Sequence, residues 1–104
     1  MLRDDIVQLT HGWASRGHKA NRARQRRMML TFADFAEAAG ARQIGMLGGR
    51  MVIRYWKHLR ALGRSYATQM DHWRALRELW ALAGIPGEVP APRCPDASIR
   101  QAAL

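Results

Sequence analysis

The sequence predicts an all-α protein: a bundle of four helices joined by short connections and followed by an extended, proline-containing C-terminal tail. Strand signals are almost absent, because no stretch alternates apolar and polar residues with β-branched enrichment. Apolar residues recur instead at helical spacing in four segments, and glycine or proline separates these segments. A chain of 104 residues is long enough for one small domain with a modest core.

The first helix is expected from about Asp4 to Ala14, with Asp4 or Asp5 as its cap. Its apolar face consists of Leu2, Ile6, Leu9 and Trp13. The second helix is expected from Lys19 to Ala39, before Gly40. Its C-terminal half is amphipathic through Met28, Phe32, Phe35 and Ala39. Its N-terminal half, 19–27, has almost no apolar residue, so we expect a partner outside the core to account for it.

A loop over 40–49 leads to a third helix, expected from Arg50 to Leu62 and ended by Gly63. Its buried stripe is Val52, Tyr55, Trp56, Leu59 and Leu62, and Arg50, Arg54 and Lys57 line its other side. Ser65 is the expected N-cap of a fourth helix that runs to Ala83. Gly84 and three prolines then end helical structure. The expected domain is therefore 1–92, and 93–104 is a tail or linker with a candidate turn near 99–103.

Basic residues outnumber acidic ones by seventeen to eight, for a formal net charge of +9. Twelve of the seventeen lie in two blocks without an acid, six between Asp5 and Asp34 and six between Glu37 and Asp71. A surface without a charged partner mixes the two signs. The pattern indicates a polyanionic partner, and nucleic acid is favoured over an anionic membrane surface.

Several function classes lack a sequence signal. The single cysteine, Cys94, excludes a disulfide framework and a multi-cysteine zinc site. No apolar run has the length of a membrane span, and no secretory segment is visible at the N-terminus, so a soluble intracellular protein is expected. Neither a phosphate-binding loop nor a metal or catalytic motif is present. We therefore expect no enzymatic activity, no cofactor, no metal, no membrane association and no small-molecule substrate.

The start of the second helix is the first candidate binding site. Lys19, Arg22, Arg26 and Arg27 lie there, where cations oppose the helix dipole unless an anion is nearby. A DNA phosphate supplies such an anion, whereas the alternative is a solvated run of charge. The four tryptophans fall on apolar stripes and are expected in the core rather than stacked on bases.

The start of the fourth helix is the second candidate site, with a polar first turn and a half. It contains Arg64, Ser65, Tyr66, Thr68, Gln69 and His72. Ser65 and Thr68 can simply cap the helix. The alternative is that Gln69 and His72, three residues apart, read base edges in a major groove.

The segments 63–68 (GRSYAT), 73–80 (WRALRELW) and 84–86 (GIP), followed by Pro90, resemble the second half of the core-binding domain of tyrosine recombinases. That family's SAM-like four-helix domain precedes the catalytic domain of phage and integron integrases. The stretch from Arg16 to Gly40 is more loosely similar to the family's first two helices. The resemblance covers about residues 2–92.

The resemblance implies a domain that clamps double-stranded DNA with its second and fourth helices. Carried over by position, the implied contacts are Lys19, Asn21, Arg22 and Arg26, together with Arg64, Ser65, Tyr66, Thr68, Gln69 and His72. Arg54 and Lys57 of the third helix complete the candidate set. The family's catalytic arginine, lysine, His-x-x-Arg and tyrosine nucleophile have no counterpart in this chain.

The expected function is therefore non-catalytic DNA binding in the bacterial cytoplasm, associated with the nucleoid when bound. The chain is either a module of a recombinase or a free-standing relative linked to DNA integration, with a homo-oligomer on DNA as a further candidate state. Two alternatives stay open. One is a transcriptional regulator of a mobile element, and the other is a helical adaptor that binds an acidic protein.

Overall fold

A computed structural model describes residues 1–94 and is helical, with no strand in that range. Helix α1 spans Leu2–Ala14, α2 spans Lys19–Ala38, α3 spans Gly49–Ala61 and α4 spans Tyr66–Ala83, with a short 3-10 turn, η1, at Ile44–Met46. The predicted all-α class with four helices is confirmed. Most of the predicted tail, 93–104, and the candidate turn near 99–103 lie outside the described residues.

The helix ends follow the predicted turn chemistry with one exception. Ser65 caps α4, since its Oγ accepts a hydrogen bond from the backbone N–H of Thr68 at 3.2 Å. Gly40 and Gly84 follow α2 and α4 with φ of 103° and 65°, a region that favours glycine. The predicted cap of α1 is wrong, because α1 begins at Leu2 and no side chain caps it. Asp4 and Asp5 lie inside the first turn, where their charge favours the helix dipole.

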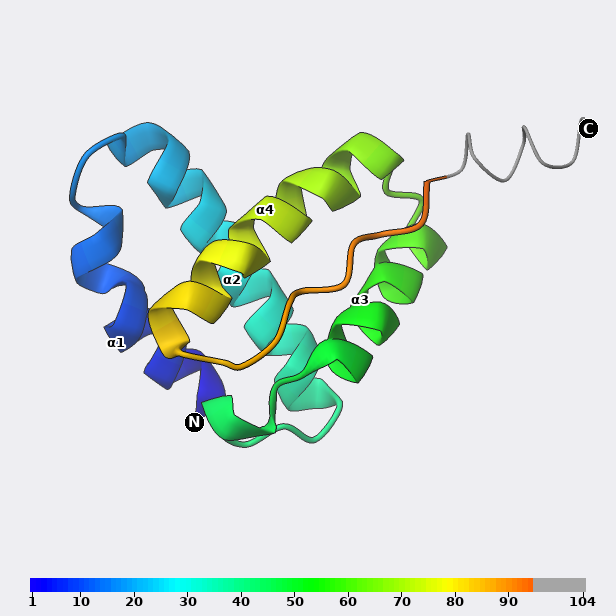
Figure 1. Cartoon of the computed structure of the whole chain (residues 1–104), viewed down its shortest axis with the longest axis horizontal. Helices are drawn as coiled ribbons and strands as arrows, with labels where there is room; N and C mark the ends of the chain where they lie inside the picture. The colour runs from blue at the N-terminus through cyan, green and yellow to red at the C-terminus, as the bar shows by residue number, and fades with distance from the viewer. Residues whose placement is uncertain (95–104) are drawn as a thin grey trace, which may run out of the picture.

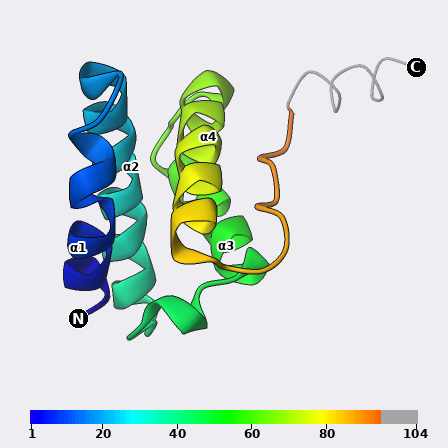
Figure 2. The ribbon, with the colours of Figure 1, turned by 60° about the vertical axis from the view of Figure 1, so that its left-hand side comes forward.

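The helices form two layers. Helix α1 packs along α2, and α2 also packs against α4. Figure 1 shows α2 and α4 crossing, with α3 beside them, and Figure 2 shows the α1–α2 layer next to the α3–α4 layer. The layer of α3 and α4 is therefore joined to the rest mainly through α2.

Aromatic side chains fill the space between α2, α3 and α4. The ring of Phe32, on α2, meets Tyr55 of α3 edge-on at 5.1 Å between centroids and Trp80 of α4 at 6.0 Å. Phe32 and Tyr55 are fully buried, and Trp80 is nearly so. Aromatic pairs in this geometry add about 0.5–1.5 kcal/mol beyond the apolar area they bury. The core prediction is confirmed for Trp13, Trp56 and Trp80, while Trp73 is half-buried.

The segment after α4, 85–94, is an extended strap that lies across α3 and α4. Figure 2 shows it on the side of these helices away from α1 and α2. The indole N–H of Trp56 donates to the carbonyl oxygen of Pro90 at 2.9 Å, and the indole N–H of Trp73 donates to that of Val89 at 3.0 Å. Val89 is buried. These contacts make the strap part of the packed structure.

Two arginines fasten the polar half of α2 to α1. Arg26 donates from Nε to Thr10 Oγ1 at 2.9 Å and from a terminal nitrogen to the carbonyl oxygen of Val7 at 3.1 Å. Arg22 donates to the carbonyl oxygen of Trp13 at 2.9 Å, and its guanidinium lies 5.1 Å from the centre of the Trp13 ring. The expectation that no packing accounts for 19–27 is therefore wrong. Helix α1 covers one side of this half through polar and cation–π contacts.

Replacing Arg26 with alanine is expected to lower the free energy of unfolding by about 1–3 kcal/mol. The change removes two charged hydrogen bonds and leaves the fully buried Thr10 hydroxyl without its donor. Arg27→Ala is the matched control, because Arg27 is the next residue, has the same charge and is exposed. Its effect should stay within about 0.5 kcal/mol. Urea denaturation of both variants measures the difference, and equal losses would contradict the fastening role of Arg26.

Candidate nucleic-acid interface

The structure divides the basic residues into those with an intramolecular partner and those without one. Ion pairs join Arg3 to Asp34 at 2.7 Å and both Arg24 and Arg74 to Asp71. Arg22 and Arg26 bind α1, as described above. Within residues 1–94, exposed cations whose side chains have no hydrogen bond or ion pair are Lys19, Arg27, Arg42, Arg50, Arg54, Lys57, Arg60, Arg64, Arg77 and Arg93.

The outer side of α3 contains the densest group of these cations. Arg50, Arg54 and Lys57 lie opposite the buried stripe of Val52, Tyr55, Trp56 and Leu59, at intervals of four and three residues. Arg60 is also exposed, and Arg64 follows in the turn to α4. Helix α3 contains no acidic residue. We call Arg50, Arg54, Lys57, Arg60 and Arg64 the α3 basic surface.

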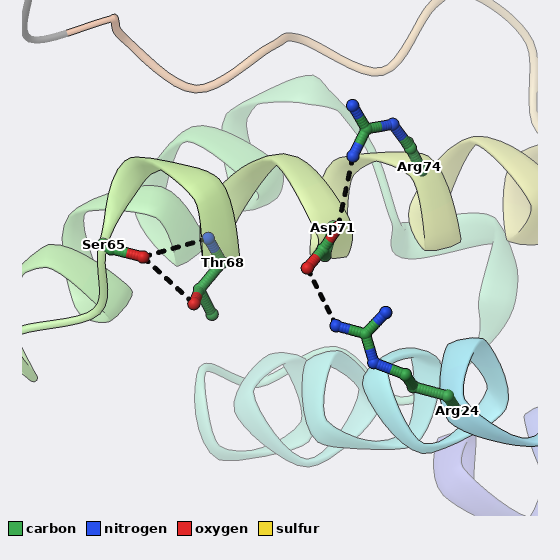
Figure 3. A network of polar contacts seen from close by, with 5 residues as sticks. All are labelled: Arg24, Ser65, Thr68, Asp71 and Arg74. Carbon is green, nitrogen blue, oxygen red and sulfur yellow. Dashed lines mark hydrogen bonds and ion pairs between the residues drawn. The ribbon is translucent and has the colours of Figure 1, made fainter. Parts of the chain in front are cut away.

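The predicted site residues on α2 have different environments. Lys19 and Asn21 are exposed at the start of the helix, whereas Arg22 and Arg26 face α1. Figure 3 shows Arg24 and Arg74 both directed at the Asp71 carboxylate, which they reach at 2.8 and 3.2 Å. An acidic group therefore lies where the start of α2 meets α4. Of the predicted arginines on α2, Arg22 and Arg26 therefore contact α1.

The start of α4 has a largely structural role in the fold. Ser65 donates its hydroxyl to Thr68 Oγ1 at 3.1 Å and caps the helix through the Thr68 backbone, as Figure 3 shows. Gln69 is only 3% exposed and donates to the carbonyl oxygen of Arg64 at 3.1 Å. The prediction that Gln69 reads base edges is incorrect, because its amide points into the protein. Tyr66 is half-buried, and Arg64 is exposed.

His72 also points inward, toward α3. Its Nδ1 lies 3.0 Å from the hydroxyl of Tyr55. Burial lowers the pKa of His72, and Arg24 and Arg64 act in the same direction although Asp71 opposes them. Burial raises the pKa of the Tyr55 hydroxyl, which therefore stays protonated. In the neutral imidazole with its proton on Nε2, Nδ1 accepts a hydrogen bond from the Tyr55 hydroxyl, and this hydrogen bond joins α4 to α3.

Two members of the α3 basic surface, Arg50 and Arg60, were absent from the predicted site. The sequence contains a signal for Arg50, which is one helical turn before Arg54 on the same face. Arg60 lies on the flank of α3, and its exposure depends on how the helix packs. Of the predicted residues, Arg54 and Lys57 lie with Arg50 on the outer side of α3, and Arg64 is exposed in the turn that follows the helix.

Two other kinds of feature, a metal site and a membrane-spanning helix, are not found in the part of the chain described. Residues 1–94 contain no group of three or more His, Cys, Asp or Glu side chains arranged to hold a metal ion. Among the described helices, none combines the length and apolarity needed to cross a membrane. No protein-family model, curated protein or solved structure matches this chain.

The free energy of unfolding is expected to fall as the pH drops below about 6.5. The folded pKa of His72 lies under its unfolded value, so the unfolded chain binds the proton first and acid favours unfolding. In His72→Asn, which keeps an acceptor for Tyr55, this decrease should be smaller.

Urea denaturation between about pH 7.5 and about pH 5 measures the effect. His11→Asn is the control, since His11 is exposed on α1. The attribution to His72 fails if both substitutions leave the same pH dependence as the original sequence.

Proposed function

We propose that this chain binds double-stranded DNA without cutting it, through the α3 basic surface. The observation that carries the proposal is that all five cations of this surface are exposed and none has an intramolecular partner within residues 1–94. The first basic block differs, because Arg22, Arg24 and Arg26 are held by the fold itself. Cations without acidic neighbours are the groups with which proteins neutralise DNA phosphates.

The dimensions of α3 suit a DNA strand. Arg50 and Lys57 are seven residues apart, which is about 10 Å along a helix. Three base pairs rise by about the same length. Arg54 lies between them, so the three side chains can each contact a different phosphate of one backbone. Such contacts position a protein on DNA without reading its sequence, and base preference would come from neighbouring polar side chains.

We also propose that the four helices form a SAM-like bundle of the core-binding type. The segments that carry the resemblance coincide with structural junctions: 63–68 forms the turn into α4 and its N-cap, and 84–86 follows the end of α4. The proposed protein is a module of a recombinase or a free-standing relative, and regulation of a mobile element is one role that a free-standing relative would fill. Of the residues implied by the resemblance, Lys19, Asn21, Arg64 and Tyr66 keep accessible surface for a DNA contact.

Binding to a labelled duplex should weaken steeply with salt. If each of the five cations neutralises one phosphate, log K falls against log salt with a slope of about −4.5. The double substitution Arg54→Ala/Lys57→Ala should lower affinity similarly on unrelated sequences and reduce the slope by about 2. Fluorescence anisotropy across a series of salt concentrations measures both quantities.

The matched control is Arg3→Ala/Arg16→Ala. It removes the same total charge from α1 and the turn after it, at two residues that do not belong to the α3 basic surface. This control should keep most of the affinity and nearly the original slope. Equal losses in the two double variants would show that net charge alone attracts DNA. A slope near zero for the unsubstituted protein would reject DNA binding and favour the adaptor alternative.

A further inference from the structure

A cleft of about 540 Å³ opens between the C-terminal half of α2, the end of α3 and the start of α4. Sites for small organic molecules commonly have this size and combine apolar walls with a few polar groups. The walls here include Phe35, Tyr55, His58, Leu59, Leu62 and Arg64. The cleft lies on the α2 side of α3 and shares only Arg64 with the α3 basic surface.

The walls of the cleft combine aromatic and aliphatic side chains with five polar ones, Thr31, Asp34, His58, Arg64 and His72. The ring centroids of Phe35 and His58 lie 5.0 Å apart, and those of Phe35 and Tyr55 lie 5.3 Å apart. Three ring systems are therefore grouped together. The prediction that Leu62 belongs to the buried stripe of α3 is wrong, because Leu62 follows the last residue of the helix and is 55% exposed. It is one of the few large apolar side chains that the described fold leaves in water. An apolar ligand that covered Leu62 would remove this surface from water, which favours binding.

The charges around the cleft favour an anion. Arg64 is exposed, and its guanidinium has no partner within residues 1–94. The one acidic side chain in the lining, Asp34, is already neutralised, since both of its oxygens accept from Arg3 at 2.8 and 2.7 Å. A guanidinium binds a carboxylate with two parallel hydrogen bonds. Of the charged groups in the lining, Arg64 is therefore the one free to bind a ligand.

We propose that this cleft binds a flat aromatic carboxylate, with its rings against Phe35, His58 and Leu62 and its carboxylate on Arg64. The aromatic side chains of the cleft pack against the rings of the ligand. The guanidinium hydrogen-bonds to its carboxylate, which a neutral analogue lacks. Arg64 belongs both to this cleft and to the α3 basic surface, but the proposal does not depend on DNA binding, because binding of the carboxylate is measured without DNA.

Titration of the ¹⁵N-labelled chain with 2-naphthoate tests the site. Saturable amide shifts are expected at the end of α3 and in the α3–α4 turn, whereas the strap residues 85–94 should not move. Arg64→Gln should weaken naphthoate binding about tenfold, the effect expected for a lost charged hydrogen bond. It should leave the weak binding of the neutral analogue 2-naphthalenemethanol unchanged.

Arg60→Gln is the matched control, because Arg60 has the same charge at the end of α3 but does not line the cleft. It should bind naphthoate as the original sequence does. Ala38→Phe is a second variant, in which an exposed residue of the lining is enlarged to fill the cleft, and it should abolish the saturable shifts. The proposal is overturned if shifts are absent or unsaturable, if they map to another region, or if Arg60→Gln and Arg64→Gln weaken binding equally. Each variant is first checked for native helicity by circular dichroism.

Discussion

Tyr55 is the side chain that joins α3 to both of its neighbouring helices. Its ring is fully buried against Phe32 and Phe35 of α2, and its hydroxyl bonds to His72 of α4. A single residue thus holds α3 to both neighbouring helices. Because the Tyr55 hydroxyl is buried, it requires a partner, and the neutral imidazole of His72 supplies the acceptor. The orientation of α3, and with it the direction in which its cations point, follows from this arrangement.

The strap completes the attachment of α3 from the opposite side. Trp56 follows Tyr55 in the chain and points to the other flank of α3, where its indole N–H meets the carbonyl oxygen of Pro90. Trp73 of α4 makes the equivalent bond to Val89. Since proline lacks a backbone N–H, the strap cannot form a helix or a regular ladder here, and its carbonyl groups are free to accept from side chains. Helix α3 is consequently held between Tyr55 contacts on one flank and the strap on the other.

Folding divides a strongly basic chain into two kinds of arginine. On α2, arginines replace apolar residues as the contact with α1, and their long side chains reach backbone carbonyl groups. On α3, aromatic residues make the packing contacts. The cations on its outer side form no hydrogen bond or ion pair within residues 1–94. The two acid-free blocks look alike in the sequence, but within residues 1–94 the first leaves only Lys19 and Arg27 without a side-chain hydrogen bond or ion pair, whereas the second leaves all six of its cations so. The proposed DNA-binding surface rests on this difference.

The helices of this protein were determined by local sequence. Apolar spacing, the Ser65 cap and the glycines after each helix act within a few residues of one another, so all four helices could be predicted with nearly correct ends. The start of α1 was predicted at the wrong residue, because aspartate is favoured both as an N-cap and within the first turn of a helix. Arg54 and Lys57 could be identified as exposed cations for the same local reason, since helical periodicity alone separates them from the core stripe, and Arg64 could be identified because it lies in the turn after Gly63.

Tertiary structure decided which polar side chains are exposed and without an intramolecular partner, and so can contact another molecule. Arg22 and Arg26 resemble surface cations in the sequence, but the carbonyl groups that hold them belong to α1, nine to nineteen residues earlier. Gln69 lies in a polar first turn and is nevertheless buried, because the turn from α3 folds its backbone over the amide. The cleft has no local signal, since three helices supply its walls. Hydrogen bonds and cavities of this kind depend on distances between distant segments, which periodicity within one helix does not encode.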